Sequence, residues 1–166
     1  MVATKHLETI RLIKEKDDPT LADIIRKNLE RFHLDIPGTV YFDPQLNHLS
    51  NYYTANLEKR TYFVVEDVNG KLLGGIGIDE FPRFEKCAEI QKLYLTDEAK
   101  GKGLGKALME TAESYAVQVG YKRLYLETHT NLEVAVHLYE KLGFHKIQKP
   151  REVQHSTMNL FFMKEL

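Results

Sequence analysis

The stretch from Leu93 to Ala116, LYLTDEAKGKGLGKALMETAESYA, puts three glycines and three lysines between an apolar strand and an amphipathic helix. Glycine permits backbone conformations, and a close approach of ligand to backbone, that a β-carbon would block. The first turn of a helix leaves unpaired N–H groups at the positive end of the helix dipole. Because lysines surround the same turn, the stretch predicts a binding site for an anion, and a diphosphate is its natural ligand.

The spacing of the glycines distinguishes this turn from two other phosphate loops. A Walker loop needs a glycine five residues before its Gly-Lys pair and Ser or Thr after it, but Lys100 precedes Gly105 at that distance and Ala107 follows the pair. The dinucleotide fingerprint G-x-G-x-x-G fails as well, because Gly101, Gly103 and Gly105 are separated by single residues. A plain connection between a strand and a helix would require neither the glycines nor the lysines.

The composition is that of one ordinary globular domain. The chain has 166 residues, of which 43% are hydrophobic and 28% charged, so we expect a single domain over residues 1–166. A formal net charge of -1 gives no general attraction to nucleic acid or to anionic membranes. Cys87 is the single cysteine and the histidines lack ligand spacing, so we expect no metal site. Without a signal peptide or an apolar run of roughly 20 residues, we expect a cytoplasmic protein.

Hydrophobic patterns predict an α+β fold with a mixed, mostly antiparallel sheet flanked by helices. Strands are predicted at 8–14, in a hairpin over 60–81, and at 87–95, 123–128 and 158–166. The hairpin turn is Asn69-Gly70, a pair that tolerates positive φ. Helices are predicted at 17–32, 44–57, 106–117 and 132–142, the last two ended by glycine.

The glycine turn resembles a known family. KGKGLGKAL is similar to the acetyl-coenzyme A pyrophosphate loop of the GCN5-related N-acetyltransferases (GNAT superfamily), whose pattern is Gln/Arg-x-x-Gly-x-Gly/Ala. Lys100 stands in the first position, Gly103 in the fourth and Gly105 in the sixth. Lysine is a departure from the pattern, since it keeps the charge but lacks the planar guanidinium.

A second motif of the same family follows. NLEVAVHLYEKLGF resembles the segment in which an Asn precedes a helix ending in Leu-Tyr-Glu-Lys-Leu-Gly-Phe. Asn131 precedes Tyr139 by eight residues, whereas many members have seven. The two motifs occur in the family order with a strand between them, over about Glu89 to Phe144.

The resemblance implies a GNAT (acyl-CoA N-acyltransferase) fold whose sheet splays open to hold acetyl-coenzyme A as co-substrate, with no metal. Its pantetheine is expected to pair with the backbone of Leu93–Leu95, and its diphosphate to bind the glycine turn. The cofactor-binding residues expected from the resemblance are Leu93, Tyr94, Leu95, Lys100, Gly101, Lys102, Gly103, Leu104, Gly105, Lys106, Asn131 and Tyr139.

The resemblance also implies the catalytic residues. Tyr139 is the expected acid, which protonates the leaving thiolate. Glu89 is the expected base, because histone-type members carry their glutamate at this spacing before the end of the strand, and partial burial would raise its pKa. In this family the segment between the first two helices commonly forms the acceptor pocket. Three other residues are alternative bases: Glu127, Asp79 and His155.

The predicted function is N-acetylation. An acetyl group moves from acetyl-coenzyme A to a primary amine by direct attack. The acceptor stays open between a small-molecule amine and a peptide or protein N-terminus, with no nucleic-acid or membrane partner and with a possible homodimer. The alternatives are a non-catalytic acyl-CoA binding or sensing domain and, less well matched, a nucleotide-binding protein.

Overall fold

The structure is a computed structural model that describes residues 7–153 and 155–166. In this part of the chain one seven-stranded sheet has the order β1-β2-β3-β4-β5-β7-β6. Its strands are β1 (Thr9–Leu12), β2 (Thr61–Glu66), β3 (Leu72–Glu80), β4 (Cys87–Leu95), β5 (Arg123–Thr128), β6 (His145–Lys146) and β7 (Leu160–Glu165). The helices are α1 (Asp18–Arg31), α2 (Leu49–Thr54), α3 (Leu104–Val119) and α4 (Glu133–Lys141).

The first four strands pair in chain order, each antiparallel to the next. β2 and β3 are joined at the predicted Asn69-Gly70 turn, where Gly70 has φ +80°. The carboxylate of Asp67 accepts hydrogen bonds from the N–H groups of Asn69 and Lys71, each 2.9 Å long, and so fixes the turn. The sheet therefore continues through the hairpin into β4, as the sequence predicts.

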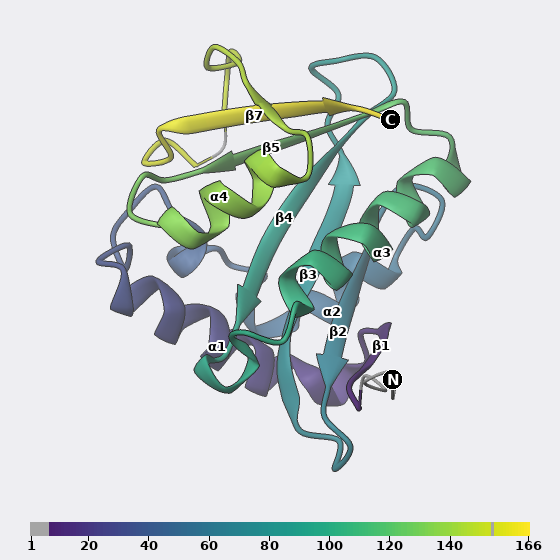
Figure 1. The fold of residues 1–166 in the computed structure, drawn as a ribbon, viewed down its shortest axis with the longest axis vertical. Helices are drawn as coiled ribbons and strands as arrows, with labels where there is room; N and C mark the ends of the chain where they lie inside the picture. Colours follow the sequence, from purple (N-terminus) through teal and green to yellow (C-terminus); the bar gives the residue numbers. More distant parts are fainter. Residues whose placement is uncertain (1–6, 154) are drawn as a thin grey trace, which may run out of the picture.

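The sheet splits between β4 and β5. These two strands are parallel and pair at only three positions: Cys87 with Arg123, Ala88 with Leu124, and Glu89 with Tyr125. From there β4 stays paired with β3, while β5 pairs along its whole length with β7. Figure 1 shows the two strands meeting at one end and diverging along their length. The carboxyl-terminal half of β4 thus presents an edge inside the molecule.

Helices cover both faces of the split sheet. On one face α3 and α4 enclose a core that includes Leu108, Leu124 and Tyr139. On the other face α1 and α2 pack residues such as Ile25 and Tyr53 against the sheet. Figure 1 shows α3 and α4 in front of the strands and α1 and α2 behind them. None of the helices in the described part of the chain has the length and apolar character to cross a bilayer.

The predicted helix at 44–57 is wrong in extent. The structure has a 3-10 turn at Leu46–His48 and then the six-residue α2. The carboxylate of Asp18 on α1 accepts hydrogen bonds from both the N–H of Ser50 (2.9 Å) and its hydroxyl (2.6 Å). A tertiary contact therefore caps the first turn of α2, and no upstream helix is needed. The sequence also gave no sign of the two-residue β6.

Because one face of α3 packs against the sheet and the other is exposed, substitutions on the two faces should differ strongly in their effect on the free energy of unfolding. Leu108 is completely buried and Val117, on the same helix, is 59% exposed. Leu108→Ala should lower the free energy of unfolding by about 2–5 kcal/mol, because it leaves a cavity. Val117→Ala should change it by no more than about 0.5 kcal/mol. Urea unfolding of the two variants measures the difference, and equal losses would contradict this packing.

Candidate active site

The glycine turn leaves a row of free backbone donors at the start of α3. Gly101 and Gly103 have φ +76° and +72°, the left-handed region that favours glycine, and a β-carbon at either would meet no atom within 4 Å. Within the described residues, no N–H from Gly101 to Lys106 donates a hydrogen bond; Ala107 is the first that does, to the carbonyl of Gly103. Six donors therefore stand free at the positive end of a 16-residue helix.

The three predicted lysines surround this turn on the surface. Lys100 pairs with Asp97 at 2.8 Å, Lys102 with Glu8 at 3.3 Å, and Lys106 with Glu110 at 3.8 Å. The pairs of Lys100 and Lys106 join two exposed side chains, and exposed ion pairs of this kind are weak, whereas Glu8 is largely buried. Lys100 and Lys106 can therefore turn toward an anion at little cost.

A cleft of about 490 Å³ runs from this turn between the diverging strands. Its walls are the free part of β4, the turn, the carboxyl end of β5 and one face of α4. Ten of the predicted residues line it: Leu93, Tyr94, Leu95, Lys100, Gly101, Gly103, Leu104, Gly105, Lys106 and Tyr139. Lys102, Asn131 and Glu89 are absent from its lining.

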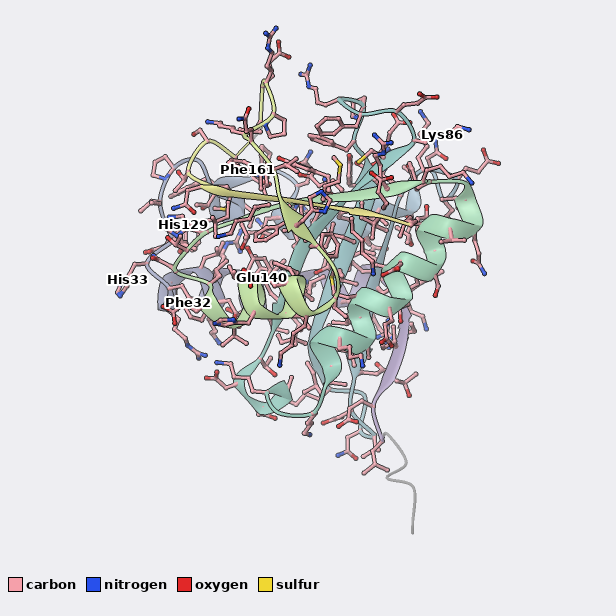
Figure 2. All side chains as sticks on the ribbon, turned by 45° about the horizontal axis from the view of Figure 1, so that its top comes forward. Phe32, His33, Lys86, His129, Glu140 and Phe161 are labelled. Carbon is pink, nitrogen blue, oxygen red and sulfur yellow. The ribbon has the colours of Figure 1, made fainter. Side chains whose placement is uncertain are left out.

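Asn131 makes a structural contact instead. Its carboxamide donates to the carbonyl of Phe32 at 2.9 Å, and its backbone N–H donates to Nδ1 of His129 at 3.0 Å. Figure 2 shows Phe32 and His129 on the same side of the molecule. Because Phe32 lines the cleft, Asn131 shapes the wall at a distance. Its role in binding a cofactor stays a prediction.

A β-bulge lies where β4 leaves β5. Gly77 is opposite Gln91 and Gly75 is opposite Tyr94, so both Lys92 and Leu93 stand against one residue of β3. Lys92 has φ +49°, and its carbonyl accepts a 2.8 Å hydrogen bond from the hydroxyl of Tyr62. A bulge bends its strand, which helps β4 to diverge. The alternation pattern of β4 gave no indication of the bulge.

Tyr139 lies on α4, lines the cleft and packs in the hydrophobic core. The residue is 6% exposed, and burial raises the pKa of its phenol well above the ordinary value. Within the described residues its hydroxyl has no hydrogen-bond partner, although the residue lines the cleft. The phenol therefore stays protonated at neutral pH and free to donate a hydrogen bond.

Glu89 does not line the cleft, but a chain of side chains from β4 and α2 connects it to Gln91, which does. The amide nitrogen of Gln91 donates to Glu89 Oε1 at 2.6 Å, and the amide oxygen of Gln91 accepts from the hydroxyl of Tyr53 at 2.5 Å. Burial, followed by the negative charge of Glu127, raises the pKa of Glu89 to about 7; the Gln91 hydrogen bond and nearby cations oppose the rise. The predicted rise is thus present, and this carboxyl changes charge near neutrality.

The alternative bases are tied to other groups. Asp79 accepts hydrogen bonds from the hydroxyl of Tyr52 and from the N–H of Glu80. Glu127 accepts from the hydroxyl of Tyr125 at 3.1 Å, and its other oxygen contacts His155. Asp79 and Glu127 each have two hydrogen-bond partners, whereas among the described residues Glu89 accepts from Gln91 alone.

Four residues of the site were missed by sequence reasoning. They are Tyr53, Gln91, Lys92 and Asp43. The signal for Gln91 was available, because it is two residues after Glu89 on one strand and therefore on the same face. Asp43 gave no such signal, since a connection between helices brings it to the site.

The sequence is similar to known acetyltransferases. Residues 25–144 match the sequence model of the acetyltransferase (GNAT) family. The uncharacterized N-acetyltransferase YjgM of Escherichia coli K12 is 36% identical over 140 residues, which cover 83% of this chain and 82% of that protein. The chain therefore belongs to the GNAT family of acetyltransferases, and it is an acetyltransferase enzyme.

Solved structures confirm the fold. A GNAT-family acetyltransferase from Staphylococcus aureus Mu50 has a TM-score of 0.84 at 15% identity, over 95% of this chain and 98% of that one. A GNAT-superfamily phosphinothricin acetyltransferase from Sinorhizobium meliloti, solved in complex with AcCoA, has a TM-score of 0.75 at 20% identity, over 96% of this chain and 89% of that one. The GNAT fold expected from the two motifs is thus confirmed.

The raised pKa of Glu89 predicts an unusual dependence of stability on pH. An unfolded glutamate titrates near 4.5, so between there and about 7 the folded protein holds a proton that the unfolded chain has released. The stabilisation is complete below the unfolded pKa and is lost as pH rises through the folded pKa, an effect of about 3 kcal/mol. Glu89→Gln removes this titration. Urea unfolding at pH 4.5 and 7.5 should show the variant gaining about 3 kcal/mol on the wild type; parallel curves would contradict the burial of a titrating Glu89.

Proposed function

We propose that the protein transfers the acetyl group of acetyl-coenzyme A to a primary amine by direct attack. One observation carries the proposal: six unpaired amides begin a cleft that passes between split strands to a buried phenol and to Gln91, which is bonded to a carboxyl with a pKa of about 7. An acyl carrier with a diphosphate and an extended arm has the matching chemistry.

The residues present fit such a carrier. The free amides from Gly101 to Lys106, with the surrounding lysines, are suited to a diphosphate. The exposed edge of β4 at Leu93–Leu95 is suited to an amide-containing arm, which would add to the edge as a strand does. When bound, acetyl-coenzyme A supplies a thioester carbonyl as the electrophile. No bound metal is invoked; within the described residues no group of three or more His, Cys, Asp or Glu is arranged to hold one.

Glu89 is the base in this proposal. The amine must be neutral when it attacks, and its nitrogen loses a proton as the amide forms. A carboxylate with a pKa near 7 can accept that proton at physiological pH. His155 is less suited, because two carboxylates hold it as the imidazolium, which has no free lone pair. Glu89 therefore takes the proton, directly or through water.

Tyr139 is the acid in this proposal. Its phenol remains protonated and has no acceptor among the described residues, so it can donate to a leaving thiolate. Cys87 supports direct transfer: it is buried, and burial raises its pKa to about 12, so it is a poor nucleophile for a covalent intermediate.

The acceptor is a primary amine of a small molecule or of a peptide or protein N-terminus. A thiol-release assay with acetyl-coenzyme A against a panel of amines and peptides tests the proposal, and mass spectrometry of the product identifies the acetylated atom. Release that depends on the amine supports it, and no release with any acceptor contradicts it. The homodimer and the cytoplasmic location stay predictions.

The thiol-release assay and calorimetry together separate the two alternatives from acetyl transfer. An acyl-CoA sensing domain would bind coenzyme A tightly yet release no thiol with any amine. A nucleotide-binding protein would bind ATP as tightly as coenzyme A. The free edge of β4 favours coenzyme A, because a nucleotide has no arm that can pair with a strand.

Tyr139→Phe should separate chemistry from binding. Loss of the phenolic proton should lower kcat about 100-fold, since general acid catalysis contributes at least that much. The affinity for coenzyme A should stay within about twofold, because the ring remains. Tyr121→Phe is the matched control; its hydroxyl donates to the carbonyl of Lys59, and it lies outside the cleft lining. An unchanged kcat in Tyr139→Phe would remove the acid role.

A further inference from the structure

A buried ion cluster lies beside Glu89 and has no part in the function proposed above. Nε2 of His155 is 3.0 Å from Oδ2 of Asp43, and Nδ1 of His155 is 3.2 Å from Oε1 of Glu127. The three side chains are 15%, 13% and 7% exposed, respectively. They come from three distant segments: the connection between β6 and β7, the connection between α1 and α2, and strand β5.

His155 is a cation in this setting. Both ring nitrogens face carboxylate oxygens, and only the imidazolium carries an N–H at each nitrogen. Burial disfavours the charged ring, but the hydrogen bonds to Asp43 and Glu127 outweigh it, and the pKa of His155 rises to about 9. The ring therefore bridges the two carboxylates at neutral pH.

Glu127 is held by donors on both of its oxygens. The hydroxyl of Tyr125 donates to Oε2 at 3.1 Å, and His155 contacts Oε1. The strand register places Glu127 near Glu89, because Glu89 pairs with Tyr125 and Glu127 is two residues further along β5 on the same face. Burial raises the pKa of Glu89 most, the charge of Glu127 raises it further, and the charge of His155 lowers it.

The cluster also joins two connections on the face of the sheet that carries Glu89. The N–H of Thr157 donates to the carbonyl of Gly38 at 3.1 Å, and its hydroxyl donates to the carbonyl of Pro37 at 2.6 Å. His155 is two residues away, in the same segment. Hydrogen bonds thus hold the β6–β7 connection against the α1–α2 connection, and His155 adds a charged contact between the same two connections.

We propose that His155 is a positioning residue for acetyl transfer: its imidazolium bridges Asp43 and Glu127, which holds the Glu127 carboxylate in place and keeps a cation beside Glu89. The inference rests on the proposed function, in which Glu89 is the base. His155 itself touches no reacting atom in this scheme.

The groups that face the cluster define the test. From β4 they are Glu89, with Gln91 bonded to it, and Lys92, whose Nζ is 3.8 Å from Oδ2 of Asp43. From β5 they are Tyr125 and Glu127, and from the two connections Asp43 and His155. From β3 the group is Asp79, which lies opposite Glu89 in register and accepts a hydrogen bond from Tyr52 of α2. A change of charge at His155 or at Glu127 should therefore move the titration of Glu89 in opposite directions.

The experiment is a ¹³C-carboxyl NMR titration of Glu89 in the free protein. His155→Gln should raise the titration midpoint of Glu89 by about 1 pH unit, because a nearby cation is lost. Glu127→Gln should lower it by about 1 unit, because a nearby anion is lost. His155→Lys is the matched control: it breaks the same bridge but keeps the charge, so its midpoint should stay close to that of the wild type.

Three results would overturn the proposal. They are an unchanged or lowered midpoint in His155→Gln, an equal shift in His155→Gln and His155→Lys, and an unchanged midpoint in Glu127→Gln. The wild type gives a separate reading that needs no variant to fold. Imidazole ¹⁵N shifts should show both nitrogens of His155 protonated at pH 7, and a neutral ring at that pH would also overturn it.

These NMR measurements need no enzyme activity, so each of the two proposals can be contradicted independently of the other. If no amine is acetylated, the proposed function fails while the titrations still report the cluster. If acetylation occurs but the midpoint of Glu89 does not respond to His155, only the positioning role fails. In an active enzyme, the acidic limb of kcat/KM should move with the midpoint measured by NMR.

Discussion

Hydrogen bonding between β4 and β5 stops after Glu89, and every feature of the site depends on that early stop. Buried main-chain groups need partners, so an open strand edge inside a domain has to be satisfied by something else. Side chains satisfy part of it: Asn28 donates to the carbonyl of Leu95 at 3.0 Å, and Tyr62 donates to that of Lys92. The remainder faces a cleft about 490 Å³ in volume. The bulge at Lys92 and the helices packed on each face keep the two strands apart.

The two ends of this cleft have opposite chemistry, although the chain as a whole is nearly neutral. At the start of α3, free amides, the helix dipole and three lysines favour an anion. At the other end, Glu127 lines the cleft and contacts the His155 imidazolium, and burial, followed by the charge of Glu127, raises the pKa of Glu89 to about 7. In the proposed function, anion binding and proton transfer are therefore separated along one cleft, and a variant at one end is expected to leave the other intact.

Local patterns predicted the parts of the molecule that local forces build. The Asn69-Gly70 turn, the strand bounds of β4 and the glycine turn before α3 follow from conformational preference and periodicity. The sequence could not predict features that distant segments create. The cap on α2 comes from Asp18, the bulge at Lys92 from pairing with β3, and the bridge through His155 from two connections that meet only in the folded chain. For this reason most residues that line the glycine-turn end of the cleft were named from the sequence, whereas the contacts that join Glu127, His155 and Asp43 were not.

The most direct test of the account observes the amides of the turn themselves. Coenzyme A is added to ¹⁵N-labelled protein, and the backbone N–H resonances are followed in two-dimensional NMR spectra. We expect the largest shifts on Gly101 through Lys106, because these six donors are free in the protein and would form hydrogen bonds to the diphosphate. Saturable binding of coenzyme A that leaves these resonances unmoved would contradict it, as would the absence of any binding.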